Sequence, residues 1–431
     1  MKSSARFYFR FMLLLAVFLP APVAAERIFF AGYNGGFYIQ SEEEGGMALR
    51  LGGSFYADYR RYMENERPDN RFDIRQSRLI FRGQLTRWFR FGMEYEFQGN
   101  ETDNLVDAYA EAVFAPHSLR FGQFKEPFGL EWQTSDKAIY FAERSMGNAL
   151  RPGRDVGLML HGGLFQDGVR YAVGVFNGSG DDGSTAVRRQ DDPECTARLV
   201  FRPFREMKSD WLQGFQLGCA GSFANIDVSQ VDVKVKSTGM VGISRNIYVL
   251  SANTKFGVLQ DAESRDRIAA ETAWSHDSFA LQGEYMTLSY RDLKPAGNPP
   301  RDASFSAWYG SLLWCLTGEQ PVFSEGVLQP IYPNTNFNPD EHTYGAFLLA
   351  ARYDHFSGDK NWITPDTFVS VEDADSVSLA VNWILYPMVK VVGDYTFTNL
   401  SDPIRIQVHP DGTIDYVDKE NVLTLRFAID F

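Results

Sequence analysis

Cysteine is scarce in this chain of 431 residues, which holds only Cys195, Cys219 and Cys315. An odd number of widely spaced cysteines does not make a disulfide framework. No second cysteine or histidine stands within a few residues of any of them, so they do not indicate a metal site. Because no glycine-rich phosphate loop or metal-ligand pair stands out elsewhere, we expect no metal and no cofactor.

Long apolar runs are also missing. After residue 25 the sequence has no stretch of about 18 or more apolar residues, which excludes membrane-spanning helices. Helical periodicity is almost absent, and strand patterns continue to the last residue. A soluble chain of this length usually divides into domains with alternating helix and strand patterns, and this sequence does not show them.

The first 25 residues have the order of a secretory signal. Lys2, Arg6 and Arg10 precede an apolar run from Phe11 to Leu19, and small residues end the segment. The apolar run is shorter than the roughly 20 residues that a membrane-spanning helix needs. We therefore expect removal of the segment after Ala25. The alternative is a buried N-terminal helix.

Basic residues do not exceed acidic ones. The formal net charge is −13, with 42 lysine and arginine residues against 55 aspartate and glutamate residues. Removal of the first 25 residues, which hold three basic groups and no acidic ones, brings the charge to about −16. Sequence-independent binding of nucleic acid depends on a basic face that neutralises phosphates. Since no zinc-finger, helix-turn-helix or RNA-binding signature occurs either, we expect no nucleic-acid partner.

What the sequence does contain is a strand rhythm, which is clearest at the C-terminus. Leu423, Leu425 and Phe427 share one parity with Ile429 and Phe431, while polar or small residues occupy the other. In a soluble sheet the apolar face would point into a core. A terminal strand that ends in an aromatic residue is instead similar to the signal read by the machinery that assembles outer-membrane barrels. We therefore expect that machinery to be a partner, through Phe431.

Similar patterns recur along the whole chain and give about sixteen candidate strands. The predicted strands are 48–61, 72–85, 88–98, 105–115, 118–125, 156–165, 168–177, 195–203, 212–224, 265–275, 278–290, 303–316, 343–354, 376–386, 388–398 and 421–431. Short turns alternate with long polar segments, which we expect to be loops: 177–193, 225–264, 291–302, 354–375 and 399–420. Short periplasmic turns and long extracellular loops are typical of outer-membrane barrels.

A spanning sheet must close on itself, because lipid cannot satisfy an unpaired strand edge. The predicted fold class is therefore all-β, a transmembrane antiparallel β-barrel of about sixteen strands, with apolar positions on membrane lipid and polar positions on an aqueous lumen. We predict a signal peptide over residues 1–25, an N-terminal periplasmic segment over 26–47 and a barrel pore over 48–431. Residues 317–342 fall where a short periplasmic turn is expected, and nothing in the sequence explains why this segment is so long.

Several motifs follow the same order as these strands. The most informative are Arg120-Phe-Gly-Gln-Phe-Lys-Glu-Pro-Phe-Gly-Leu-Glu, Phe141-Ala-Glu-Arg-Ser and Arg151-Pro-Gly-Arg-Asp-Val-Gly. Shorter pieces include Gly32-Tyr-Asn-Gly-Gly-Phe, Tyr171-Ala-Val-Gly-Val-Phe-Asn-Gly, Leu316-Thr-Gly-Glu and Asn382-Trp. As a set they span nearly the whole chain after residue 25, and the sequence resembles the phosphate-selective porin O and P family.

The resemblance implies a homotrimer of sixteen-stranded barrels in the Gram-negative outer membrane. Each barrel would have its own pore, narrowed by an inward-folded third loop at about residues 126–155. One departure concerns Gly345-Ala-Phe-Leu-Leu, which places Leu348 where the family often has an acidic residue. The resemblance predicts the fold better than it predicts the solute that passes through the pore. Phosphate selectivity does not follow from the resemblance alone.

Anion selectivity requires fixed positive charge that faces the lumen, and arginine suits it because the planar guanidinium binds phosphate oxygens in pairs. On the predicted strand 72–85, Arg78 and Arg82 lie on the polar parity. Other basic residues, among them Arg60 and Arg75, lie near the same strands. We predict that the pore constriction and its anion-binding side chains are Arg78, Arg82, Lys125, Arg144, Arg151 and Arg154.

Two observations leave the sign of selectivity open. Arginines in barrel loops commonly pair with carboxylates to hold a loop to the wall, and several acidic residues are close in sequence: Glu126, Glu131, Glu143 and Asp155. In addition, Glu94, Glu96, Asp107 and Glu111 lie on the lumen parity and would favour cations. Against them, a narrow constriction of low dielectric constant focuses the charge that lies near it.

The function we predict is passive diffusion of small solutes through an outer-membrane porin, with anions such as phosphate or polyphosphate as the expected solutes. One alternative is a general or sugar-admitting porin, for which Tyr109, Trp132 and Tyr140 could form an aromatic slide. Another is a structural or adhesive barrel with a plugged lumen. We expect no enzyme, because none of the six histidines lies in a recognisable nucleophile motif.

Overall fold

The computed structural model describes residues 28–33, 36–63, 70–98, 104–178, 192–240, 246–363 and 370–431. The predicted signal peptide, with its cleavage site at Ala25, lies outside the described residues, as do parts of the predicted loops 177–193 and 225–264.

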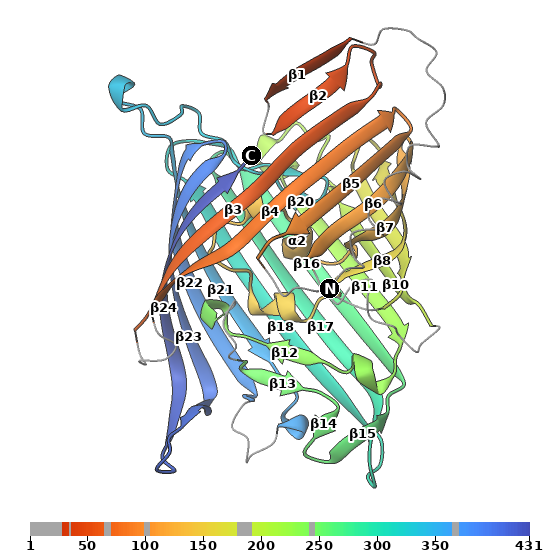
Figure 1. Ribbon diagram of the computed structural model, residues 1–431, viewed down its shortest axis with the longest axis vertical. Helices are drawn as coiled ribbons and strands as arrows, with labels where there is room; N and C mark the ends of the chain where they lie inside the picture. Colours follow the sequence, from red (N-terminus) through yellow and green to blue (C-terminus); the bar gives the residue numbers. More distant parts are fainter. Residues whose placement is uncertain are drawn as a thin grey trace, which may run out of the picture.

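Sixteen antiparallel strands form one closed barrel. Its strands are β3 (Ala48–Tyr62), β4 (Arg71–Thr86), β5 (Phe89–Glu96), β6 (Leu105–Phe114), β7 (His117–Lys125), β8 (Arg154–Leu164), β9 (Val169–Phe176), β10 (Glu194–Phe201), β11 (Gln216–Asn225), β16 (Ser264–His276), β17 (Phe279–Pro295), β18 (Arg301–Cys315), β21 (Ala346–Ser357), β22 (Asp373–Tyr386), β23 (Val389–Val408) and β24 (Ile414–Asp430). Each pairs with the next in this order, and β24 pairs with β3 from Val422 opposite Tyr62 to Asp430 opposite Ser54. The sheet is therefore closed, as Figure 1 shows.

The alternation of the strands assigns their two faces as the sequence indicates. On β24 the side chain of Leu425 is 52% exposed on the outside, whereas that of the next residue, Arg426, is buried inside. The outer wall is apolar because it meets lipid, and the inner wall is polar because it meets the lumen. The prediction of a sixteen-stranded antiparallel barrel is confirmed.

One predicted loop is wrong. Residues 399–420 were expected to form a loop, but β23 continues to Val408 and β24 begins at Ile414. The two strands stay paired over this stretch, with Ile404 opposite Val417. Polar residues occur on both faces there, so the sequence loses its apolar alternation although the backbone ladder persists.

The segment between β11 and β16 also has structure of its own. It contains β12 (Val233–Val235), β13 (Tyr248–Leu250), β14 (Asn253–Thr254) and β15 (Gly257–Asp261). Val233 and Tyr248 are buried in one apolar cluster with Tyr290 and Phe305, which lie on the inner parity of β17 and β18. Instead of a solvated loop, these residues form a cover on the inner wall near the end of the barrel where the long loops lie.

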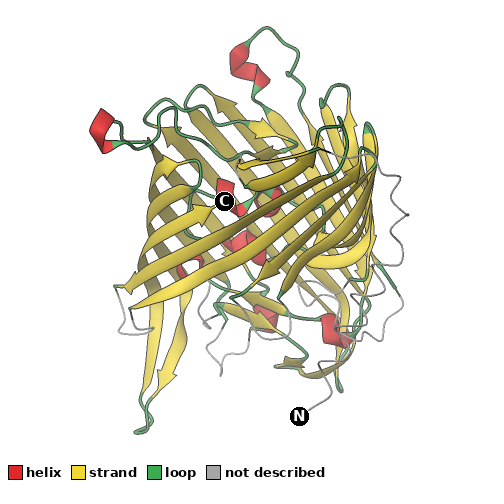
Figure 2. Ribbon diagram, turned by 45° about the horizontal axis from the view of Figure 1, so that its top comes forward, coloured by secondary structure: helices red, strands yellow, loops and turns green. Residues whose placement is uncertain are grey.

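Helices are few and short in the described part of the chain, as Figure 2 shows. There the α-helices are α2 (Leu130–Gln133) and α3 (Asp210–Gln213), and 3₁₀ turns occur at 136–138, 146–149, 228–230, 238–240, 339–341 and 360–362. Among the described residues, no helix combines the length and the apolar composition that crossing a membrane requires.

Two segments enter the barrel from opposite ends. The third loop, residues 126–153 between β7 and β8, contacts strands far from both: Asn382 on β22 donates to the Tyr140 carbonyl oxygen at 2.8 Å. The inner turn, residues 316–345 between β18 and β21, contains the hairpin of β19 (Phe323–Ser324) and β20 (Val327–Leu328). The backbone N–H of Ile331 in the inner turn donates to the Tyr140 hydroxyl at 2.7 Å, so the two segments meet. This inward fold explains the length of residues 317–342.

Candidate pore constriction

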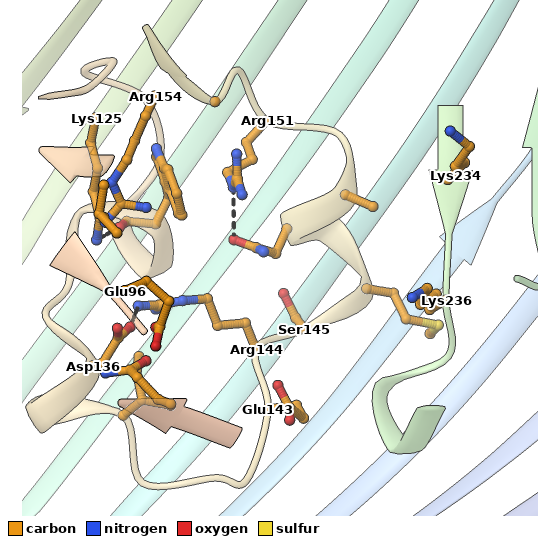
Figure 3. A pocket seen from close by; sticks show the side chains of 18 of the residues that line it. Glu96, Lys125, Asp136, Glu143, Arg144, Ser145, Arg151, Arg154, Lys234 and Lys236 are labelled. Carbon is orange, nitrogen blue, oxygen red and sulfur yellow. Dashed lines mark hydrogen bonds and ion pairs between the residues drawn. The ribbon is translucent and has the colours of Figure 1, made fainter. Parts of the chain in front are cut away.

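The third loop, the barrel wall and the β12 segment enclose a cavity of about 690 Å³. Its lining is unusually rich in basic side chains: Arg75, Arg78, Lys125, Arg144, Arg151, Arg154, Lys234, Lys236, Arg265, Arg267, Lys390 and Arg426. The acidic side chains of the same lining are Glu96, Asp136, Glu143 and Asp232. Figure 3 shows this cavity from close by. The chain is acidic as a whole, yet the charged side chains that line this cavity are mostly basic.

Glu143 anchors the third loop to the wall. Its carboxylate accepts two hydrogen bonds from Arg75 on β4, at 2.8 and 3.0 Å, and further bonds from Arg60 on β3 and Arg426 on β24. Burial would raise the pKa of the Glu143 carboxyl, but Arg75 and Arg60 hold that pKa well below its ordinary value. Asp58 accepts from Arg426 as well, at 2.7 and 2.8 Å. Three guanidinium groups thus share the carboxylates of Glu143 and Asp58, which ties the loop to β3, β4 and β24.

A second anchor holds the start of the loop against the opposite wall. Glu284 on β17 accepts from the backbone N–H groups of Leu130 and Glu131 at the first turn of α2. The Glu131 carboxylate in turn pairs with Arg352 on β21 at 3.1 Å. All these groups are buried, so each charge needs its partner. The loop is therefore fixed across the lumen at both sides.

Arg78 and Arg144 converge on Asp136 in the third loop. Arg78 reaches the Asp136 carboxylate at 3.0 Å and also pairs with Glu94 and Glu96 of β5. Arg144 binds the other oxygen of Asp136 and donates to the Thr134 carbonyl oxygen at 3.0 Å. Burial raises the pKa of the Asp136 carboxyl, yet Arg144 and Arg78 outweigh it and hold the pKa well below its ordinary value. These two arginines therefore hold the loop together. This pairing of arginines with carboxylates is the alternative to anion binding that the sequence left open.

Three of the four remaining cations of the predicted constriction lie around one aromatic ring, and we call this group the Trp132 cluster. The Arg151 guanidinium carbon lies 3.4 Å from the Trp132 ring centroid, the Lys125 nitrogen 4.6 Å and the Arg154 carbon 5.0 Å. Lys125 also donates to the Trp132 carbonyl oxygen at 2.7 Å, and Arg154 pairs with Asp107 at 3.0 Å. The ring attracts cations to its face but carries no net charge, so it does not neutralise them as a carboxylate would.

Arg82 lies outside this cavity. It is exposed on the inner wall near the end where β3 begins, directly opposite Arg50 in the β3–β4 ladder. The sequence parity of Arg82 places it inside the barrel, but its height along the strand leaves it out of the cavity lining. Of the six predicted side chains, the structure brings together Arg78, Lys125, Arg144, Arg151 and Arg154.

Several lining residues were not among the predicted six. Arg265 and Arg267 on β16 and Arg426 on β24 lie on the polar parity of their strands, so the sequence held a signal for them. Lys234 and Lys236 alternate with Val233 and Val235, but this short strand pattern lies in a segment that was expected to be a loop. In Figure 3 both stand apart from the arginines of the third loop.

Lys236 makes no ion pair with any carboxylate that the structure describes. Burial, and then the nearby Arg75 charge, lower the pKa of its amine.

The aromatic residues of the sugar-porin alternative do not line an open slide. Trp132 is buried beneath the cations, and Tyr140 is buried with its hydroxyl bound to the inner turn. Tyr109 packs under Arg120, whose guanidinium carbon lies 4.1 Å from the ring centroid. Metal chemistry has no visible site either, because the described residues contain no group of three His, Cys, Asp or Glu side chains that could hold an ion.

Comparisons with known proteins agree with this architecture. The model of the family described as "Phosphate-selective porin O and P" matches residues 48–431. The chain is 24% identical over 380 residues to Porin O of Pseudomonas aeruginosa, which covers 81% of this chain and 82% of that protein.

Two solved folds are similar at low sequence identity. OmpT of Vibrio cholerae has a TM-score of 0.53 at 10% identity and covers 90% of this chain and 99% of its own, and a second structure of OmpT is described as the trimer form. An anion-selective porin from Comamonas acidovorans has a TM-score of 0.52 at 10% identity, and the match covers 89% of this chain and 100% of that one.

Proposed function

Because the chain belongs to the phosphate-selective porin O and P family, we propose that it forms a passive pore for small anions such as phosphate or polyphosphate. The chain is an outer-membrane porin with a barrel that surrounds its own lumen. The observation that carries the anion proposal is the excess of basic over acidic side chains around the cavity. Arginine and lysine rings are the usual means by which pores select anions.

The Trp132 cluster is the part of the cavity that we propose as the main anion-binding surface. Around Asp136 and Glu143, arginines are largely compensated by carboxylates. At Trp132 three cations gather on one neutral ring, and Arg154 also pairs with Asp107. A charge in surroundings of low dielectric constant attracts an anion more strongly than the same charge does in bulk water. The predicted residues Arg78, Arg82 and Arg144 then contribute to the field around this surface.

Other parts of the proposal concern assembly and location. We propose a homotrimer, consistent with the trimer form described for OmpT. The even strand count places both chain ends at one side, which we assign to the periplasm, with the signal peptide removed near Ala25 and Phe431 read by the barrel-assembly machinery. In this arrangement the backbone of Phe431 completes the wall through two hydrogen bonds with Gly53, at 2.8 and 3.0 Å. We propose that the protein acts as a channel without catalysing a reaction.

Single-channel recording in planar bilayers tests the anion proposal. With a potassium chloride gradient, we expect a reversal potential that favours chloride, and we expect added phosphate to lower the chloride conductance. A reversal potential that favours potassium, with no effect of phosphate, would remove the anion proposal and leave the porin. Absence of any conductance from folded protein would instead favour the structural barrel.

A further inference from the structure

Two strands precede the barrel in the segment that was expected to be periplasmic. They are β1 (Phe29–Tyr33) and β2 (Phe37–Ser41), which pair with each other as a hairpin. β2 also pairs with β3, from Phe37 opposite Leu51 to Gln40 opposite Ala48. The sequence did not predict either strand.

The hairpin continues the wall at the place where β24 ends. β4 occupies one edge of β3 along this whole stretch, so β2 must occupy the edge that β24 uses further along. β24 stops at Asp430, opposite Ser54, and β2 begins its pairing opposite Leu51. Figure 1 shows β1 and β2 extending the row of strands beside β3.

The far side of the hairpin reaches the neighbouring strands. The Tyr33 hydroxyl on β1 contacts the sulfur of Met388, in the turn between β22 and β23. β2 therefore lies in line with β24, and β1 lies beside the turn that leads into β23. The hairpin fills the part of the wall that these two strands leave open.

The faces of the hairpin follow those of the barrel. The register places Tyr33, Phe37 and Leu51 on one face, and Leu51 is opposite Phe81 of β4 on the outer wall. Phe37 is 56% exposed and Ile39, on the same face, is 50% exposed. The other face carries residues that continue the polar inner wall: Tyr38, Gln40, Arg50 and Arg82.

We propose that the β1–β2 hairpin is embedded in the membrane, with its apolar face against the acyl chains of the periplasmic leaflet. The apolar face is continuous with the outer wall of β3 and β4, which already meets lipid. In water this face would expose a row of aromatic and branched side chains, which is unfavourable, whereas lipid accepts them. The membrane-embedded chain then starts near residue 29 instead of residue 48. The proposal does not depend on which solute the pore admits.

Spin labels at successive positions of β2 test this proposal in the full-length protein. In a background with Cys195→Ala, Cys219→Ala and Cys315→Ala, one cysteine at a time replaces Phe37 or Tyr38, and the protein is reconstituted in phospholipid vesicles. Collision of the label with oxygen, which partitions into lipid, is compared with collision with a water-soluble nickel complex. Conductance of each labelled variant verifies folding.

The expected result is an alternation. At Phe37→Cys oxygen collides more often than the nickel complex, and at Tyr38→Cys the order reverses. The outward Leu425→Cys on β24 gives the lipid reference. Frequent nickel collisions at both β2 positions would overturn the proposal, since the hairpin would then stand in water. Protection of Phe37→Cys from both reagents would also overturn it and would place a second copy of the chain on this face.

A second pair of label positions tests the proposal even if the substitutions in β2 disturb the hairpin. Leu49→Cys and Arg50→Cys lie on β3, directly opposite β2, and leave the hairpin sequence unchanged. If the hairpin is embedded, these two positions show the same alternation of lipid and water exposure. Nickel access at Leu49→Cys equal to that at Arg50→Cys contradicts the proposal on its own.

Discussion

Removal of two cations from the Trp132 cluster is the sharpest test of the proposed anion surface. We expect the double variant Arg151→Ala, Arg154→Ala to lose anion preference while it still folds and assembles. Both guanidinium groups stack on Trp132, at 3.4 and 5.0 Å from its ring centroid, and both line the cavity. They are not part of the Glu143 anchor that fixes the third loop to the wall.

The size of the effect follows from Coulomb's law. An anion about 6 Å from one guanidinium gains roughly 3 kcal/mol at an effective dielectric constant of about 20. Pore water and salt screen most of this energy, so we expect about 1–2 kcal/mol for the pair. That energy corresponds to a drop of roughly 5- to 30-fold in the permeability ratio of chloride to potassium, at about 1.4 kcal/mol per tenfold change.

The assay is the reversal potential of the double variant in a potassium chloride gradient. The matched control is Arg291→Ala, Lys294→Ala, which removes the same charge from exposed positions of β17. The control should retain the parent selectivity, because the lost charges lie outside the cavity. If the double variant keeps the reversal potential of the parent protein while it assembles normally, Arg151 and Arg154 are scaffolding, and the reasoning from the Trp132 cluster is refuted.

Three further predictions concern the same cavity. Trp132→Leu should weaken the binding of each neighbouring cation to this site by about 0.5–2 kcal/mol and thereby reduce anion preference. Trp132→Phe should retain the anion preference, because it keeps an aromatic face. Equal reversal potentials for the two variants would contradict the role of the ring. Glu143→Gln should remove one partner of a buried cluster at a cost of about 3–5 kcal/mol, which loosens the third loop and gives larger, noisier single-channel currents with an intact barrel. The lowered pKa of Lys236 predicts that its positive charge is lost at a lower pH than that of an exposed lysine, so anion preference should fall as the pH rises toward 10. Lys236→Arg should make that fall smaller without removing it, because other lysines also line the cavity. Equal falls in the parent protein and in Lys236→Arg would contradict the role of Lys236.

The strands of the barrel could be predicted because their alternation is imposed locally. Each of them faces lipid on one side, so apolar and polar residues must alternate whatever the neighbouring strands are. The predicted strand 48–61 is β3 over Ala48–Tyr62, and the predicted strand 376–386 is β22 over Asp373–Tyr386. Within residues 399–420 the side chains of Leu400, Ile404 and Val417 are buried in an apolar cluster instead of facing lipid, so the alternation of the barrel wall no longer applies although the strands remain.

The candidate site was predictable in part. Parity places Arg78 inside the barrel, and the motif at residues 151–157 indicates the end of the third loop. The same parity selected Arg82, which lies away from the cavity, because parity gives the face of a strand and says nothing about height relative to a loop. Lys236 was missed because the short alternation of Val231, Val233 and Val235 with charged residues lies in a segment that was assigned to a long loop, and such a short pattern does not show that the segment folds back into the lumen.

The sequence by itself therefore determined the wall of this protein: its strands, the face each residue takes and the need for closure. Only the tertiary structure decided what fills the lumen. The third loop is held by Glu143 against Arg426, residues that are far apart in the chain, and the inner turn meets Tyr140 across the barrel. Contact with lipid acts on each strand separately and leaves a local pattern, whereas such long-range pairs leave none until the chain has closed.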